Sequence, residues 1–170
     1  MAPRSGPEPS LRCDEGLATI APPRARASTP PVWWPSTRLG VPVPRYFEFE
    51  VTLQEIEPRL WRRFLLRTTS SFALLHLAIQ EAFGWENCHL WECRLPAPLD
   101  RVLAGTPNDD GDDCGRPTPD GREVKLNTYF TGQRALEWCE YEYDLGDSWV
   151  HDVKLIGVHS IKDTFKRRLL

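Results

Sequence analysis

Two histidines and two aspartates offer the clearest chemistry in this sequence. Asp144, Asp147 and His151 lie in one short stretch, YEYDLGDSWVHDV, and His89 precedes that stretch along the chain. Imidazole nitrogens and carboxylate oxygens bind divalent metals, and a carboxylate can orient a histidine that acts as a general base. The candidate functional cluster therefore consists of the following residues: His89, Asp144, Asp147, Trp149 and His151.

This cluster has two interpretations. In the functional interpretation, the side chains converge on a divalent metal, with His89, Asp147 and His151 as the candidate ligands. Zinc would require ligand atoms about 2.0–2.2 Å from a common point. In the structural interpretation, the aspartates cap a turn, and His151 packs against Tyr143 and bonds a backbone carbonyl. We favour the structural interpretation, assign no metal or other cofactor, and leave catalytic residues unassigned.

The stretch around the cluster predicts a β-hairpin. In both arms apolar and polar residues alternate, which is typical of half-buried strands. If both apolar faces point to one core, the loop must contain an odd number of residues. We predict a three-residue loop over residues 146–148. The register that follows pairs these residues: Tyr143 with His151, Tyr141 with Val153, Glu142 with Asp152, and Glu140 with Lys154.

Periodicity predicts the other elements. Alternation indicates strands over residues 46–53, 60–66 and 89–95. Apolar residues at helical spacing indicate a helix that ends at Phe83. Ser70 or Ser71 is expected to cap its N-terminus, and Gly84 follows its last residue. Residues 96–122 are interpreted as an irregular surface loop. Together these elements predict an α+β fold, a mainly antiparallel sheet of about five strands with one principal helix packed on one face.

Three polar residues within these elements have structural interpretations. His76 lies near the edge of the helix's apolar stripe, where a histidine whose hydrogen bonds are satisfied is expected. Arg62 and Arg63 point to opposite faces of their strand, so one of them is expected to pair with a carboxylate. We favour these interpretations over substrate or ligand binding.

The chain divides into three predicted parts. Residues 1–44 hold 10 of the 16 prolines and predict a disordered or extended leader. In it, the pair Trp33-Trp34 either docks on the domain or binds a partner, and we favour docking. Residues 45–158 form the predicted domain, and residues 159–170 a basic C-terminal tail.

Composition excludes several classes of protein. The net charge of residues 1–40 is +2 and that of the remainder is −5, so the domain lacks the basic footprint of nonspecific nucleic-acid binding. Acidic residues cluster over 109–113, where a solvated loop is favoured over a cation site because EF-hand spacing is missing. No apolar run is long enough to cross a membrane. Five cysteines and no secretion signal predict reduced thiols and a cytoplasmic protein.

Four ordered blocks of sequence carry a family resemblance. They are IEPRLWRRF (56–64), LLHLAIQEAFGW (74–85), HL (89–90) and YEYDLGDSWVH (141–151). On these blocks the chain resembles the Ri plasmid (pRiA-type) ORF-three-like family, also named passenger or resolvase-like proteins of insertion elements. The resemblance covers residues 46–158. In this chain Trp91 and Cys93 replace the family's aromatic or histidine and its phenylalanine.

The resemblance implies an α+β, cytoplasmic protein of bacteria or archaea, linked to plasmids and insertion elements. It carries over no catalytic residues, and the resolvase label is a name rather than a mechanism. Family members usually continue beyond the hairpin, so a chain that stops at Leu170 is expected to be a truncated copy. The Pro-rich leader is not part of the family pattern.

Two functions follow as hypotheses. We favour a non-enzymatic accessory domain of a mobile element that binds a protein partner or a nucleoprotein complex. The alternative is a metal-dependent hydrolase or nuclease that uses the His/Asp cluster, although no motif of a standard enzyme is present. A weaker third hypothesis is direct DNA binding through the basic residues 166–168, which would be strongly salt-dependent.

Overall fold

Alternating apolar residues form most of the strands of this protein. The computed structural model describes residues 42–107 and 117–170. Within them the chain forms, in order, β1 (Arg45–Leu53), β2 (Trp61–Arg67), α1 (Phe72–Phe83), β3 (Trp91–Arg94), β4 (Val102–Gly105), α2 (Asn127–Phe130), β5 (Trp138–Tyr143), β6 (Trp149–Ser160) and β7 (Arg167–Leu169). Most of the predicted leader, including Trp33-Trp34, and the acidic residues 109–113 lie outside the described residues.

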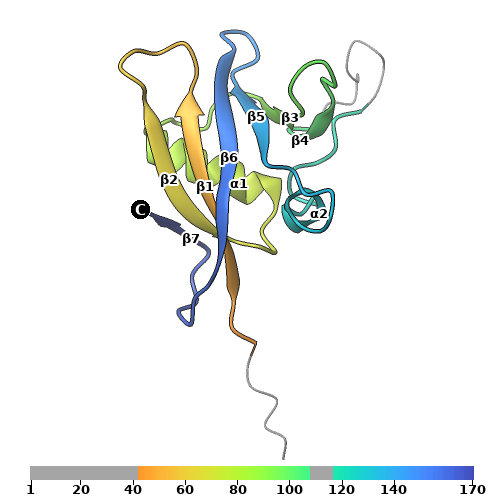
Figure 1. Ribbon diagram of the computed structural model, residues 1–170. Coiled ribbons are helices and arrows are strands. Elements are labelled where there is room, and N and C mark those ends of the chain that lie inside the picture. Colours follow the sequence, from red (N-terminus) through yellow and green to blue (C-terminus); the bar gives the residue numbers. More distant parts are fainter. Residues whose placement is uncertain (1–41, 108–116) are drawn as a thin grey trace, which may run out of the picture. The chain divides into compact units, whose positions relative to one another are not determined.

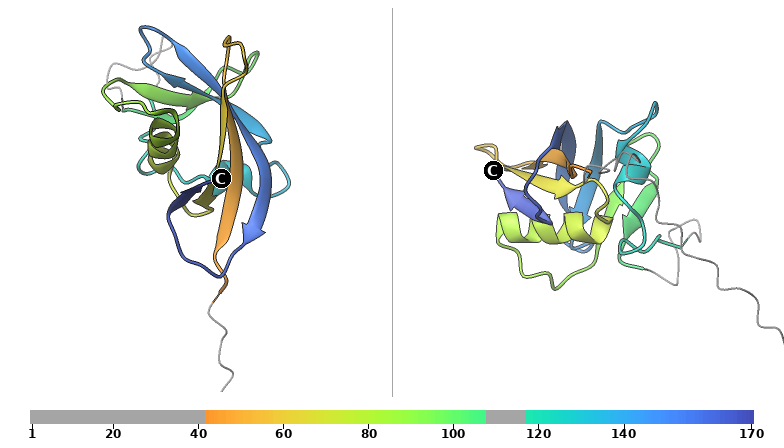
Figure 2. Two further views of the ribbon diagram at one scale, coloured as in Figure 1. Left: turned by 90° about the vertical axis from the view of Figure 1, so that its left-hand side faces the viewer. Right: turned by 90° about the horizontal axis from the view of Figure 1, so that it is seen from below.

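The strands form one sheet in the order β4-β3-β5-β6-β1-β2-β7, and every neighbouring pair is antiparallel (Figure 1). The long strands β1 and β6 lie in its centre. The helix α1 lies against one face of the sheet (Figure 2). None of the helices among the described residues is long and apolar enough to cross a membrane.

The predicted fold of about five strands and one principal helix is wrong. The sheet has seven strands, and the two helices are short, with 12 residues in α1 and four in α2. Strand β4 lies in the stretch predicted to be a loop, and β7 lies in the predicted tail. Neither β4 (VLAG) nor β7 (RRL) alternates apolar and polar residues, and both form here because a neighbouring strand offers hydrogen-bonding partners.

Helix α1 begins and ends where the sequence predicts. Ser71 is its N-cap residue, with an extended backbone, although its side chain makes no capping hydrogen bond. Gly84 follows the helix with φ of 75°, in the left-handed region that glycine adopts without strain. The apolar stripe of α1 faces a core rich in aromatic side chains. Rings from β1, β2, α1 and α2 meet in this core: Phe47, Phe49, Phe64, Phe72 and Phe130.

The hairpin of β5 and β6 has the predicted odd-numbered loop, but its length and register differ from the prediction. The loop contains residues 144–148, so Tyr141 pairs with His151 and Tyr143 with Trp149. The left-handed positions are Asp144 and Ser148, each with φ of 57°, and not Gly146. A shift of two residues keeps every side chain on its predicted face, so alternation alone could not distinguish the two registers.

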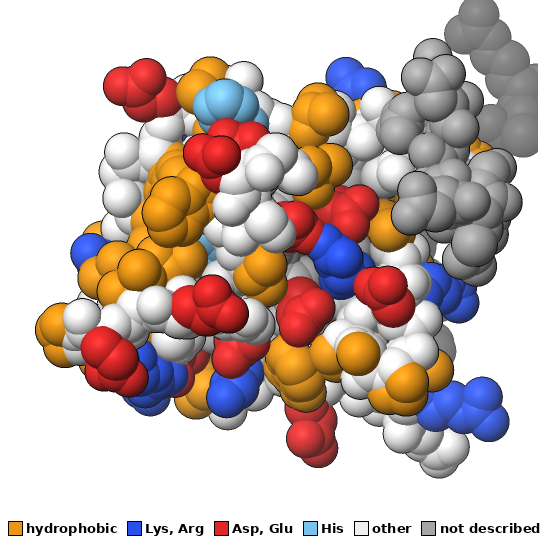
Figure 3. Space-filling model, turned by 90° about the horizontal axis from the view of Figure 1, so that it is seen from above, with side chains coloured by type: hydrophobic (Ala, Val, Ile, Leu, Met, Phe, Trp, Pro, Cys, Tyr) orange, Lys and Arg blue, Asp and Glu red, His pale blue; other side chains and the backbone are white. Residues whose placement is uncertain are grey.

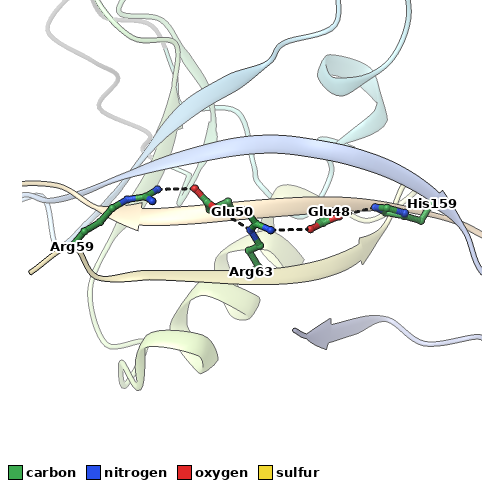
Figure 4. Close-up of polar contacts among 5 residues, drawn as sticks. All are labelled: Glu48, Glu50, Arg59, Arg63 and His159. Atoms are coloured by element: carbon green, nitrogen blue, oxygen red, sulfur yellow. Dashed lines mark hydrogen bonds and ion pairs between the residues drawn. The ribbon is translucent and has the colours of Figure 1, made fainter.

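The polar face of the sheet carries a ladder of charges (Figure 4). Arg59 bonds Glu50 (2.6 Å), Glu50 bonds Arg63 (2.8 Å), Arg63 lies 3.8 Å from Glu48, and Glu48 bonds His159 (2.7 Å). The predicted pairing of one of the two strand arginines with a carboxylate is confirmed for Arg63. Each carboxylate of the ladder therefore has a cationic or histidine partner.

Candidate functional site

Three connections meet at one end of the sheet, the end at the top of Figure 1. We call this region the loop end and define it as residues 54–60, 84–90 and 144–148 together with Trp149. Backbone hydrogen bonds hold these connections in place: the Asp144 N–H donates to the Leu90 carbonyl (2.9 Å), and the Gln54 N–H donates to the Val150 carbonyl (2.9 Å). The loop end is therefore a set of fixed turns rather than a set of independent loops.

His89 and Asp144 lie together at the loop end, as the sequence suggested. The Nδ1 atom of His89 is 3.3 Å from a carboxylate oxygen of Asp144. The imidazole is half-exposed, whereas Asp144 is mostly covered. The other carboxylate oxygen of Asp144 accepts a hydrogen bond from the Gly146 N–H (3.2 Å). Asp144 therefore stabilises the turn and orients His89 with the same side chain.

His151 lies inside the protein and not at the turn surface. Its ring is fully buried among Phe83, Trp85 and Tyr141. Its Nδ1–H donates to the Trp149 carbonyl (3.0 Å), which leaves Nε2 unprotonated in the neutral ring. Burial lowers the pKa of His151 from 6.5 to about 4. The neutral ring is thus a packed part of the core at neutral pH.

Asp147 and Trp149 lie on the side of the turn away from His89. Asp147 is exposed, and Trp149 is 37% exposed with its ring edge against Trp85 (5.4 Å between centroids). Among residues 42–107 and 117–170, no group of three or more His, Cys, Asp or Glu side chains could hold a metal ion. The structure thus pairs His89 with Asp144, and it does not gather the four predicted side chains around one point.

Sequence reasoning missed a buried polar network beside this site. The Tyr141 hydroxyl lies 2.8 Å from Nδ1 of His76 and accepts a hydrogen bond from Gln80 (3.0 Å). Asn87 closes the network through Nε2 of His76 (2.5 Å), and its N–H donates to Gln80 (2.8 Å). The spacing of His76 and Gln80, one helical turn apart, is the signal that could have indicated it. The predicted structural role of His76 is confirmed.

The electrostatics of this network follow from burial. Burial lowers the pKa of His76, and the hydrogen bond that its Nε2–H donates to the Asn87 carbonyl oxygen partly opposes this change. Burial likewise raises the pKa of Tyr141. The His76 ring stacks on Trp91 (4.5 Å, 6° between planes), and Trp91 in turn packs so closely on Gly121 that no Cβ would fit there. The network therefore attaches the segment before β3 firmly to α1 and β5.

The acidic face of the hairpin is partly neutralised. Glu142 is buried, forms an ion pair with Arg94 and accepts a hydrogen bond from Ser148 (2.6 Å). The predicted pairs on the polar face, Glu142 with Asp152 and Glu140 with Lys154, are wrong because the register of the hairpin is shifted by two residues. Glu142 pairs with Val150, and Glu140 pairs with Asp152.

Two pockets flank the β5–β6 turn. The hairpin–β3 pocket, of about 470 Å³, is lined by Cys88, His89, Leu90, Asp144 and Leu145 among others. The hairpin–β1 pocket, of about 410 Å³, is lined by residues that include Glu55, Ile56, Asp147 and Trp149. No lysine or arginine lines either pocket. Both pockets are therefore acidic and apolar in character.

Large apolar side chains are exposed around these pockets. Ile56, Leu90, Leu145 and Trp149 are 37–55% exposed. Figure 3, which views this end, shows hydrophobic side chains beside acidic ones. Four non-glycine residues at this end have positive φ: Glu55, Asn87, Asp144 and Ser148. Strained backbone of this kind persists where the surrounding structure holds it, and it concentrates at functional sites.

A family model matches residues 45–168 of the chain, and its description is plasmid pRiA4b ORF-3-like protein. The match covers well over half of the sequence. The chain belongs to the pRiA4b ORF-3-like family. The family predicted from the four sequence blocks is thereby confirmed.

Two relatives of this pRiA4b ORF-3-like chain have no described activity. The uncharacterized protein y4hQ of Sinorhizobium fredii strain NGR234 is 34% identical over 108 residues, which are 62% of this chain and 50% of that protein. The chain thus spans about half the length of this curated relative. The crystal structure of MM3350, a protein of unknown function from Methanosarcina mazei Go1, matches with a TM-score of 0.62 and 28% identity, over 75% of this chain and 68% of that one.

The four blocks that carry the pRiA4b ORF-3-like resemblance come together in space. Ile56, Trp85, Leu90 and Trp149 each belong to a different block, and all four lie at the loop end. The last block follows the other three by about 50 residues in the sequence, and the antiparallel order of the sheet brings its end beside theirs. The loop end is therefore the candidate functional site of this family member.

Proposed function

We propose that this protein is a non-enzymatic accessory module of a plasmid or insertion element and that it binds a protein partner, alone or within a nucleoprotein complex, through the loop end. One observation carries the proposal: Ile56, Leu90, Leu145 and Trp149 expose apolar surface around two adjoining pockets. Exposed apolar side chains that are scattered singly need no explanation, whereas a group of them beside polar residues is typical of an interaction site. The family name supports the link to plasmids.

The fixed geometry of the loop end supports a role in binding rather than in catalysis. Backbone hydrogen bonds and strained turns hold the apolar side chains in place, so a partner would meet a surface that loses little conformational entropy on binding. The basic residues near the C-terminus support DNA binding less well. Arg167 is paired with Glu81, and Arg168 lies over the Phe165 ring and 3.7 Å from Asp163.

Photo-crosslinking in cells of the native host tests the proposal. Benzoylphenylalanine replaces Leu145, which is 44% exposed at the loop end, or, as a matched control, Leu77, which is 40% exposed on α1. We expect a small set of discrete protein adducts from position 145 that position 77 does not give. We also expect Leu90→Ser to reduce their yield, because Leu90 lines the same pocket.

Two results would contradict the proposal. Equal adducts from positions 145 and 77 would indicate random collision, and the absence of adducts from position 145 would indicate that no protein docks there. Circular dichroism of each variant confirms that a lost adduct does not reflect unfolding.

A further inference from the structure

The hairpin–β1 pocket combines an aromatic wall with two carboxylates. Trp149 and Ile56 supply the apolar surface, and Glu55 and Asp147 supply the negative charge. With a volume of about 410 Å³, the pocket is large enough for one long side chain. The chemistry of its lining, a partly exposed indole beside two anions, favours a cation.

Glu55 and Asp147 are exposed and differ from the buried and partly buried carboxylates of the sheet. Glu48, Glu50 and Glu142 all pair with arginine or histidine. Neither Glu55 nor Asp147 makes an ion pair or hydrogen bond with another residue of the described chain, and no lysine or arginine lines their pocket. The protein thus leaves two negative charges without a counter-charge beside the partly exposed Trp149.

The pocket is rigid on both sides. On the β1 side, the Gln54 N–H donates to the Val150 carbonyl, and its side chain donates to Asp152 (2.8 Å). On the hairpin side, the Ser148 N–H donates to the Asp144 carbonyl (2.6 Å). The indole of Trp149 lies edge-on to Trp85 at 5.4 Å. A ligand would therefore find the aromatic ring and the two turns already in position.

We propose that this pocket binds an arginine side chain of the partner, with the guanidinium against the Trp149 ring and near Glu55 and Asp147. Arginine fits better than lysine because its planar, weakly hydrated group stacks on aromatic rings and donates several hydrogen bonds to carboxylates. The partner segment would then place apolar side chains on Leu145 and Leu90, next to the arginine. This inference rests on the proposed function and names the chemistry that the partner supplies.

Nuclear magnetic resonance with a small probe tests the pocket directly. N-acetyl-arginine-amide is titrated into the full-length ¹⁵N-labelled protein, and N-acetyl-citrulline-amide, which has the same shape without the charge, serves as the control ligand. We expect saturable shifts of the Trp149 indole N–H and of the backbone N–H groups of Asp147 and Val150 with arginine only. The Trp149 signal is assigned by its loss in Trp149→Phe.

Variants of the pocket complete the experiment. The double variant Glu55→Gln/Asp147→Asn is expected to raise the Kd for the arginine probe at least about fivefold, since each exposed charge contributes modestly. The matched control Glu137→Gln changes an exposed carboxylate next to β5 that does not line the pocket, so its Kd is expected to stay the same. No shifts, equal shifts with citrulline, or an unchanged Kd in the double variant would overturn the inference.

Failure of this inference is distinguishable from failure of the proposed function. If the arginine probe does not bind but the crosslinked adducts from position 145 persist, the protein docks a partner of different chemistry and only the inference is wrong. If position 145 gives no adducts in the wild-type background, the proposed function is wrong whatever the probe does.

Discussion

At the scale of single residues, burial decides what three of the four histidines of this protein do. His151 has an aromatic cage and His76 has hydrogen-bond partners on both ring nitrogens, so both are neutral parts of the interior. His89 is half-exposed and faces Asp144. Of the three, only His89 is placed to respond to a ligand at the surface.

The lowered pKa of His151 predicts a pH-dependent stability. Between pH 6.5 and about 4, an unfolded chain binds a proton at this residue that the folded protein excludes. The unfolding free energy therefore rises with pH, and the contribution of His151, about 3 kcal/mol, is complete above pH 6.5 and is lost as the pH falls toward 4. Urea unfolding at pH 7 and pH 4.5 measures it. The loss between these pH values should be smaller for His151→Leu than for the wild type, and equal losses would contradict the prediction.

The hydroxyl of Tyr141 supports the buried network. Tyr141→Phe leaves His76 Nδ1 and the Gln80 amide without this partner. We expect a loss of about 1–3 kcal/mol of unfolding free energy, because both groups stay buried and cannot bond water. The matched control is Tyr143→Phe, whose hydroxyl bonds the N–H of the exposed residue Cys88 and is expected to cost less. Similar losses in both variants would argue against the network as a stabilising unit. Urea unfolding gives the comparison.

At the scale of elements, the charge ladder couples β1 to β2 and β6. Glu50 is at its centre, where the hydrogen bond from Arg59 and then that from Arg63 lower its pKa against the opposing effect of burial. A carboxylate whose pKa is lowered by folding stabilises the folded protein at pH values above its unfolded pKa of 4.5. This stabilisation is lost as the pH falls through the lower pKa of the folded state.

Glu50→Gln tests this coupling. We expect the variant to be less stable than the wild type at pH 7 and the difference to shrink at pH 3, because below the unfolded pKa of 4.5 the stability that the charged carboxylate contributes is progressively lost. Thermal unfolding midpoints of both proteins at the two pH values provide the measurement. A difference that does not change with pH would show that shape, rather than charge, explains the effect.

At the scale of the whole molecule, the segment after β6 completes the sheet. It crosses the polar face and stacks Phe165 on the buried ring of Tyr46 (4.1 Å between centroids). The Phe165 N–H donates to the Tyr46 hydroxyl (3.1 Å), which donates to the Asp163 carbonyl (2.9 Å). Strand β7 then pairs with β2 at the sheet edge. The predicted basic tail thus contributes to the packing of the domain.

Phe165→Ala tests this contribution. The variant uncovers Tyr46 and is expected to cost about 1.5 kcal/mol, the low end for an aromatic side chain, because Phe165 is only half-buried. Hydrogen exchange is expected to become faster in β7 than in the central strands. Val158→Ala, at an exposed site on β6, is the control and should change the unfolding free energy little. Unchanged stability of Phe165→Ala would mean that the segment covers the sheet without stabilising it.

The sequence alone determined most of the local structure of this protein. Alternation located the long strands, the apolar stripe and Gly84 located α1, and four blocks indicated the family. These features depend on neighbouring residues, and local sequence records them directly. The odd length of the hairpin loop was also predictable, because it follows from which face each side chain must take.

The tertiary structure alone decided how the residues meet. Alternation predicts the face of the sheet on which a side chain lies, but not the residue that it pairs with. The register of the hairpin, the short edge strands and the order of the strands in the sheet could therefore not be predicted from the sequence. The pairing of His76 with Tyr141, which are 65 residues apart, follows only from that order. The same order brings Ile56 and Leu90 to either side of the β5–β6 turn, because it sets which strand ends become neighbours.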